Sequence, residues 1–133
     1  MYLADTNVVS DARRGSEPVA SWLRSVPPAS VYLSVITLGE IMRGIQLKAK
    51  SDPRSAAHLT EWLSELRERY AANVLPITDR IAIEWGRICA IRPRGDADGL
   101  IAATALIHDL IVVTRNTADF DDAGVTVINP WID

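Results

Sequence analysis

Residues 2–11 read YLADTNVVSD, a short apolar run that ends at Asp5 and passes directly into a segment of helical character. The same strand-to-helix alternation continues along the chain, with further β-rich runs at residues 31–34, 74–77, 110–114 and 125–128. Alternating strands and helices are typical of βαβ units around a parallel sheet. We therefore predict an α/β fold with a central parallel sheet of about five strands, the first being Tyr2–Ala4.

The segments between these runs carry apolar residues at helical spacing. We predict helices at residues 18–26, 36–50, 53–70, 79–91 and 98–109, with a turn at 93–96. The helix at 53–70 is expected to start at Pro53, because proline is favoured in the first turn of a helix. The helices at 36–50 and 53–70 should therefore form a hairpin within one long crossover between strands.

Composition limits the class of protein. The 133 residues predict one domain spanning 1–133, and no apolar stretch approaches the roughly 20 residues of a membrane span. The N-terminus lacks the features of a signal peptide, and the single cysteine, Cys89, rules out an internal disulfide framework. We therefore expect a cytoplasmic protein with no membrane partner. A net charge of −3 is unlike proteins that hold nucleic acid by bulk positive charge, although bound cations would reverse the charge of an acidic site.

Four carboxylates stand where a strand-like run gives way to a helix: Asp5, Glu40, Asp98 and Asp119. Because the carboxyl ends of parallel strands share one edge of the sheet, these acids can meet there. Two carboxylates about 5 Å apart repel by roughly 3 kcal/mol at an effective dielectric of about 20, so such a cluster binds a cation or keeps protons. Oxygen ligands without a cysteine and histidine set favour Mg²⁺ or Mn²⁺ over zinc. The pattern indicates metal-assisted hydrolysis of a phosphodiester by water.

Each acid also has a purely structural explanation. Asp5 or a neighbour could cap the helix that follows the first strand, and Asp98 could cap the helix at 98–109. Thr37 and Glu40 match the capping box, in which a hydroxyl residue precedes glutamate by three positions. Taken together, these explanations leave open why all four acids fall on the same side of the predicted sheet.

Neighbouring residues widen the set of candidates. Asp96 is close enough in the sequence to replace Asp98, and Asp121 is close enough to replace Asp119. We assign the four tryptophans to packing, because an aromatic side chain at helical spacing usually belongs to a core or an interface. The remaining candidates are Thr114 and Asn116, expected to orient the acids, and Arg43, Arg92 and Arg94, expected to contact substrate.

Four motifs together resemble those of the PIN-domain nucleases, and among them the short VapC-type toxins of bacterial toxin–antitoxin pairs. The motifs are LADTNVVSD at residues 3–11, GEIMRGI at 39–45, DGLIAATALIHDL at 98–110 and VVTRNTADF at 112–120. They are spread over nearly the whole chain, and their combination is far more specific than any one of them.

This resemblance implies a PIN-like three-layer α/β/α fold and a Mg²⁺- or Mn²⁺-dependent endoribonuclease. Its catalytic and metal-binding residues would be Asp5, Glu40, Asp98 and Asp119, supported by Thr6, Thr114 and Asn116. The resemblance further implies an RNA substrate, a homodimer, a cognate antitoxin as protein partner, and a larger assembly with that antitoxin. The alternative function is that of a catalytically silent PIN-like module that binds RNA or protein.

Overall fold

A parallel sheet of five strands forms the centre of the computed structural model, which describes residues 1–133. The strands lie in the order β3-β2-β1-β4-β5, and every neighbouring pair is parallel. This confirms the predicted sheet. The last three strands are shorter than predicted, and the two edge strands, each with a neighbour on one side only, have two residues each. The strands are β1 (Tyr2–Ala4), β2 (Val31–Ser34), β3 (Val74–Leu75), β4 (Ile111–Val113) and β5 (Val127–Ile128).

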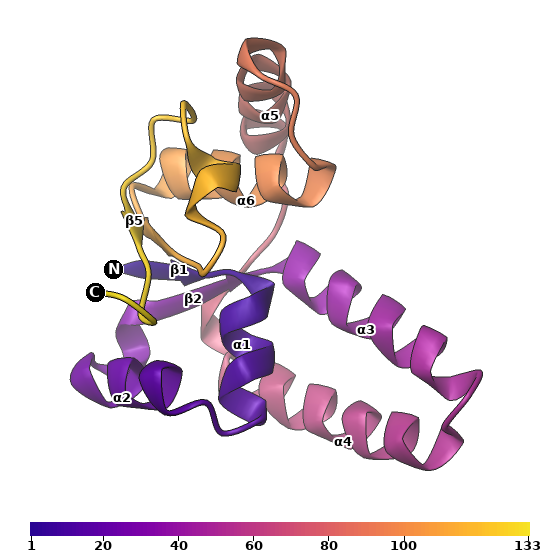
Figure 1. Cartoon of the computed structure of the whole chain (residues 1–133). Coiled ribbons are helices and arrows are strands. Elements are labelled where there is room, and N and C mark those ends of the chain that lie inside the picture. Colours follow the sequence, from indigo (N-terminus) through magenta and orange to yellow (C-terminus); the bar gives the residue numbers. More distant parts are fainter.

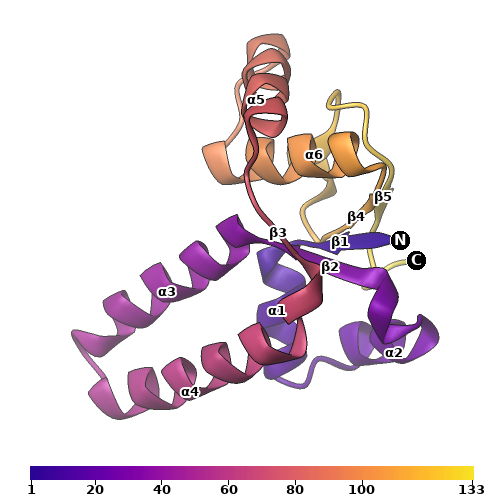
Figure 2. The ribbon, with the colours of Figure 1, turned by 180° about the vertical axis from the view of Figure 1, so that it is seen from behind.

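Helices cover both faces of the sheet, as the three-layer prediction requires. In Figures 1 and 2, α5 and α6 lie on one side of the strands, and α1, α2 and α4 lie on the other. Helices α3 and α4 run side by side as the predicted hairpin, which projects from the body of the molecule. No helix has the length and apolar composition needed to cross a membrane. The helices are α1 (Thr6–Arg13), α2 (Glu17–Ser25), α3 (Val35–Ala49), α4 (Pro53–Arg69), α5 (Asp79–Ile91) and α6 (Asp96–His108), with short 3-10 helices η1 (Pro28–Ser30), η2 (Ala71–Asn73) and η3 (Thr117–Phe120).

Two hydrophobic clusters lie on the opposite faces of the sheet. Along β1, Leu3 packs with the cluster that includes α5 and α6, whereas Ala4 packs with the cluster that includes α1 to α4. In β4, Val112 and Val113 divide between the same two clusters. Successive residues of a strand point to opposite faces, so both faces of this sheet are buried. The carboxyl edge of the strands is left as the place where polar side chains can converge.

Helices α3 and α6 begin earlier than predicted, and this changes the helical positions of two acids. Helix α3 starts directly after β2, because the side chain of Ser34 accepts a hydrogen bond from the backbone amide of Ile36 at 3.0 Å. The suggested capping box is therefore absent, since Thr37 lies buried inside the helix and Glu40 stands in its second turn. Helix α6 starts at Asp96, so Asp98 is its third residue and not its cap.

Helix α6 lies unusually close to α5 at Gly99. A Cβ atom added there would meet the Cys89 Sγ at 2.8 Å and the Trp85 Cδ1 at 2.9 Å. The small residues that follow, Ala102, Ala103 and Ala105, are buried against the sheet. The small residue at position 99 thus lets α6 pack tightly against α5, directly beside Asp98.

Candidate active site

Four acidic side chains from four separate elements lie close enough for their charges to affect the pKa of two of them. Asp5 follows β1, Glu40 lies in α3, Asp98 in α6 and Asp119 in η3. Glu40 and Asp119 both raise the pKa of Asp5, and the other three acids all raise the pKa of Asp98. The first turns of α1, α3 and α6 converge beside the end of β1 in both ribbon views (Figures 1 and 2). The structure thus brings together the acids that the sequence placed at one edge.

Asp5 is the most buried of the four acids, with 4% of its surface exposed. Its Oδ1 accepts a hydrogen bond from the Thr6 amide at 2.8 Å, and its Oδ2 accepts one from the Thr114 hydroxyl at 2.8 Å. Burial is the largest effect on the pKa of Asp5 and raises it, while these two hydrogen bonds act in the opposite direction. Asp5 is therefore the cap of α1 and a member of the acidic cluster at the same time.

The Thr114 hydroxyl sits at the centre of a hydrogen-bond network around Asp5. It accepts hydrogen bonds from the Asn116 backbone amide at 3.0 Å and from the Asn7 side-chain amide at 3.3 Å. Asn7 also donates to the Asp5 Oδ2 at 3.2 Å and accepts from the Arg115 backbone amide at 3.3 Å. The contacts of Thr114 match the orienting role predicted for it, whereas Asn116 contributes its backbone. Asn7 was not among the predicted supporting residues, although its place in the first turn after Asp5 was a usable signal.

Glu40 is joined to the site through a second pair of hydroxyl groups. The Thr6 hydroxyl donates to the Glu40 Oε1 at 2.6 Å and lies 3.1 Å from the hydroxyl oxygen of Thr37, within hydrogen-bond distance. These contacts tie the start of α1 to α3. They hold Glu40 at the cluster, although it lies in the second turn of α3. Buried Thr37 contacts the same Thr6 hydroxyl, a contact that its predicted capping role did not include.

Asp98 has the most perturbed acidity in the cluster. Burial raises its pKa to about 6, helped by the charges of Asp119, Asp5 and Glu40, while Arg94 lowers it. The side chain is partly buried at the first turn of α6. A carboxylate so placed is held in an unfavourable charged state at neutral pH, which a nearby cation would relieve.

Arg92 and Arg94 bind the backbone of η3 and its flank. The Arg92 guanidinium donates to the carbonyl oxygens of Ala118 at 2.8 Å and Asp121 at 3.0 Å. Arg94 donates to the carbonyl oxygens of Asp119 at 3.3 Å and Asp121 at 3.2 Å, while its Nε and one terminal nitrogen are buried without a partner. These contacts join the segment before α6 to the segment that carries Asp119.

The two acids that the sequence offered as alternatives to Asp98 and Asp119 are more exposed than those residues. Asp96 and Asp121 are both exposed, and neither is among the groups that raise the pKa of Asp5 or Asp98. Arg43, a candidate for substrate contact, is exposed on α3. It borders a groove together with Glu40 and Asp96.

The carboxylates do not form a closed cage for a metal ion. No three His, Cys, Asp or Glu side chains are arranged to hold a metal ion by themselves. Mg²⁺ commonly takes one or two carboxylates and keeps several waters, so it does not require such a group. The raised pKa values of Asp5 and Asp98 mark the position where a divalent cation would offset the most repulsion.

Comparison with known proteins gives matches along almost the entire chain. The family model described as PIN domain matches residues 2–125. Toxin FitB of Neisseria gonorrhoeae is 37% identical over 141 residues, covering 100% of both chains. The VapC ribonuclease Y4jK of Sinorhizobium fredii is 32% identical over 139 residues, covering 98% of both. Among solved structures, FitAcB from Neisseria gonorrhoeae matches with a TM-score of 0.90 at 36% identity, covering 100% of both chains. A toxin–antitoxin complex from Klebsiella pneumoniae matches with a TM-score of 0.77 at 28% identity, covering 98% of both.

Proposed function

Because the chain belongs to the PIN-domain family, we propose that it is a metal-dependent endoribonuclease and the toxin of a toxin–antitoxin pair. The observation that carries this proposal is the convergence of Asp5, Glu40, Asp98 and Asp119 from four elements, where the neighbouring carboxylates help to raise the pKa of Asp5 and of Asp98. The names of two relatives, a toxin and a ribonuclease, support the same activity.

Asp5 and Asp98 are the proposed principal ligands of Mg²⁺ or Mn²⁺, with Glu40 and Asp119 completing the site. When bound, the ion would lower the pKa of an attacking water and offset charge on the phosphate. The chain's own part is to hold the acids in place. The Thr114 hydroxyl fixes one oxygen of Asp5, and the Thr6 hydroxyl fixes Glu40. In this proposal the attacking group is water, and no side chain forms a covalent bond to the RNA.

We also propose a cognate antitoxin as partner and a homodimer as the toxin's own state. Support for the antitoxin comes from the Klebsiella pneumoniae structure, whose title describes a toxin–antitoxin complex. That match covers 98% of this chain, so the likeness extends over the whole fold and is not limited to the acidic site.

The test is cleavage of total cellular RNA by purified protein freed from antitoxin, with 5′ ends mapped after incubation in Mg²⁺ or Mn²⁺. New ends should appear and should be lost in EDTA and in Asp98→Asn. The matched control is Asp96→Asn, two residues earlier in the same helical turn and exposed, which should still cut. Folded, metal-binding protein that produces no new ends would instead identify a silent binding module. Ends that persist in EDTA would refute the metal requirement.

A further inference from the structure

A groove of about 250 Å³ leads away from the candidate active site between α1, α3 and α4. At the site it is bordered by Thr6 and Glu40, which are hydrogen-bonded to each other. Its lining continues to Arg13 at the end of α1 and to Lys48 near the end of α3. At about 1.5 Å per helical residue, this path is roughly 12 Å long, enough for a few nucleotides of a strand.

The groove is basic although the chain as a whole is acidic. Its charged lining residues are Arg13, Arg14, Lys48 and Glu40, three cations against one carboxylate. Arg14 is paired with Asp11, whereas Arg13 and Lys48 form no ion pair. Two cations therefore remain free to bind an anionic ligand next to the acidic cluster.

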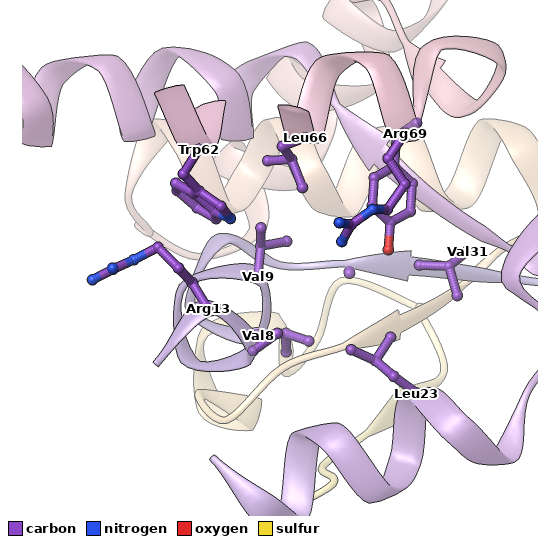
Figure 3. A pocket seen from close by; sticks show the side chains of 11 residues that line it. Val8, Val9, Arg13, Leu23, Val31, Trp62, Leu66 and Arg69 are labelled. Carbon is purple, nitrogen blue, oxygen red and sulfur yellow. The ribbon is translucent and has the colours of Figure 1, made fainter. Parts of the chain in front are cut away.

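An aromatic surface accompanies these charges. The Arg13 guanidinium lies over the ring of Trp62, 5.7 Å from its centroid, and both residues line the groove. Figure 3 shows the neighbouring apolar pocket, which Arg13 and Trp62 also line; there the Arg13 side chain points away from Val8 and Leu23. Arginine and aromatic planes are the surfaces on which bases of single-stranded nucleic acid stack. Trp62 packs against the hydrophobic core, as predicted for the tryptophans, and its ring also lines the groove.

A second groove leaves the site on the other side of Glu40 and has the opposite charge. It has a volume of about 340 Å³ between α3 and α6, and its charged residues are Glu40, Asp96 and Arg43. Two carboxylates against one cation would repel a phosphate chain. Of the two paths that meet at Glu40, only the one between α1, α3 and α4 has a charge that suits a polyanion.

We propose that single-stranded RNA lies along the groove between α1, α3 and α4, with phosphates at Arg13 and Lys48 and a base against Trp62. This inference rests on the proposed function for the identity of the substrate, and it names where the RNA beyond the cut bond is held. The two free cations offset the repulsion between the phosphate chain and the acidic cluster, which explains how a protein of net charge −3 retains RNA.

Charge-removing variants test the phosphate contacts through binding, without reference to cleavage. The probe is a fluorescein-labelled, mixed-sequence 12-nucleotide single-stranded RNA, measured by anisotropy in the Asp98→Asn background. Arg13→Gln and Lys48→Gln should each weaken binding about five-fold at about 0.1 M salt and reduce the slope of log affinity against log salt by about 0.7. Arg80→Gln, the same charge change on the exposed surface of α5, should leave both quantities unchanged. Equal effects of all three variants would overturn the proposal.

Two glycines of α3 give a steric test of the path. Gly44 lines the basic groove and Gly39 lines the acidic one, and a Cβ at either position meets nothing within 4 Å. Gly44→Gln should fill the basic groove and weaken RNA binding at least ten-fold, while Gly39→Gln, the same change on the same helix, should not. The reverse pattern would place the strand between α3 and α6 and refute the inference.

Two further outcomes separate this inference from the proposed function. Groove-dependent RNA binding by a wild-type protein that cuts no RNA would support the binding path and refute the nuclease assignment. If the Arg13, Lys48 and Gly44 variants bind RNA normally but lose the antitoxin, the groove is a protein-docking site and the inference is wrong.

Discussion

Replacing Asp98 with asparagine should raise the stability of the metal-free protein at pH 7.5 by about 1 kcal/mol while abolishing cleavage. The pKa of Asp98 rises from 3.8 to about 6 in the folded protein, chiefly through burial and the three neighbouring acids. A shift of that size corresponds to about 3 kcal/mol at 1.36 kcal/mol per pKa unit. Because the side chain is only partly buried, solvent screening reduces the expected effect to about 1 kcal/mol.

The sign of the pH dependence follows from the raised pKa. The folded protein binds the Asp98 proton more tightly than the unfolded chain does, so the favourable contribution is complete below pH 4. It is lost as the pH rises through about 6, where the folded carboxyl ionises. Asparagine does not titrate, so its advantage over the wild type should be small at pH 4.5 and complete at pH 7.5.

Urea and thermal unfolding in EDTA at these two pH values measure the effect, with an expected rise in Tm of about 3 to 5 °C at pH 7.5. Asp96→Asn is the control, because it removes an exposed acid from the same helical turn and loses the same interaction with the helix dipole. In millimolar Mg²⁺ the order should reverse, because ion binding stabilises the wild type. An Asp98→Asn protein no more stable than Asp96→Asn at pH 7.5 would refute the electrostatic reasoning.

Three other substitutions test the site and its support. Asp5→Asn should lower RNA cleavage at least 100-fold with a nearly unchanged Tm, because asparagine still caps α1; normal cleavage would remove Asp5 from the site. Thr114→Val should cost about 1 to 3 kcal/mol in urea unfolding and slow cleavage, because it leaves a buried network unsatisfied. The control is Thr104→Val, because the Thr104 hydroxyl donates only to a carbonyl oxygen of its own helix. This variant should unfold more easily but cut RNA normally. Equal loss of cleavage in the Thr114 and Thr104 variants would contradict an orienting role for Thr114. Gly99→Ala should destabilise the fold by about 1 to 3 kcal/mol, because the added methyl group overpacks against α5. Gly86→Ala, with open space around it, should be neutral or stabilising. Similar Tm values for the two variants would contradict the close contact of α5 and α6.

The chain's local patterns predicted most of its elements. The bounds of β1, β2 and α5 match the structure, and α4 differs by one residue at its end. The starts of α3 and α6 were misplaced because capping residues are common near helix ends, and sequence alone does not show which one accepts the amide. In the structure the Ser34 side chain caps α3, whereas Gly95 precedes α6 without a side-chain hydrogen bond.

The contacts of Arg92 and Arg94 could not be predicted from the sequence. Arg92 and Arg94 were predicted to contact substrate because they precede the acids of α6, but here they hold the backbone of η3. The basic groove combines Arg13 of α1, Lys48 of α3 and Trp62 of α4, which share no motif. No spacing along the chain could have grouped them.

The chain's local patterns are enough to predict the alternating strands and helices and the edge of the sheet at which the four acids lie. Hydrophobic periodicity depends on residues close together in the chain, and strands that alternate with helices favour a parallel sheet whose carboxyl ends share one edge. The packed fold, in contrast, is needed to see that Thr6 donates to Glu40, that Thr114 and Asn7 donate to Asp5, and that a basic groove lies beside the acids. These contacts join residues up to 109 positions apart, and they exist because packing of the helices on both faces of the sheet sets the distances between them.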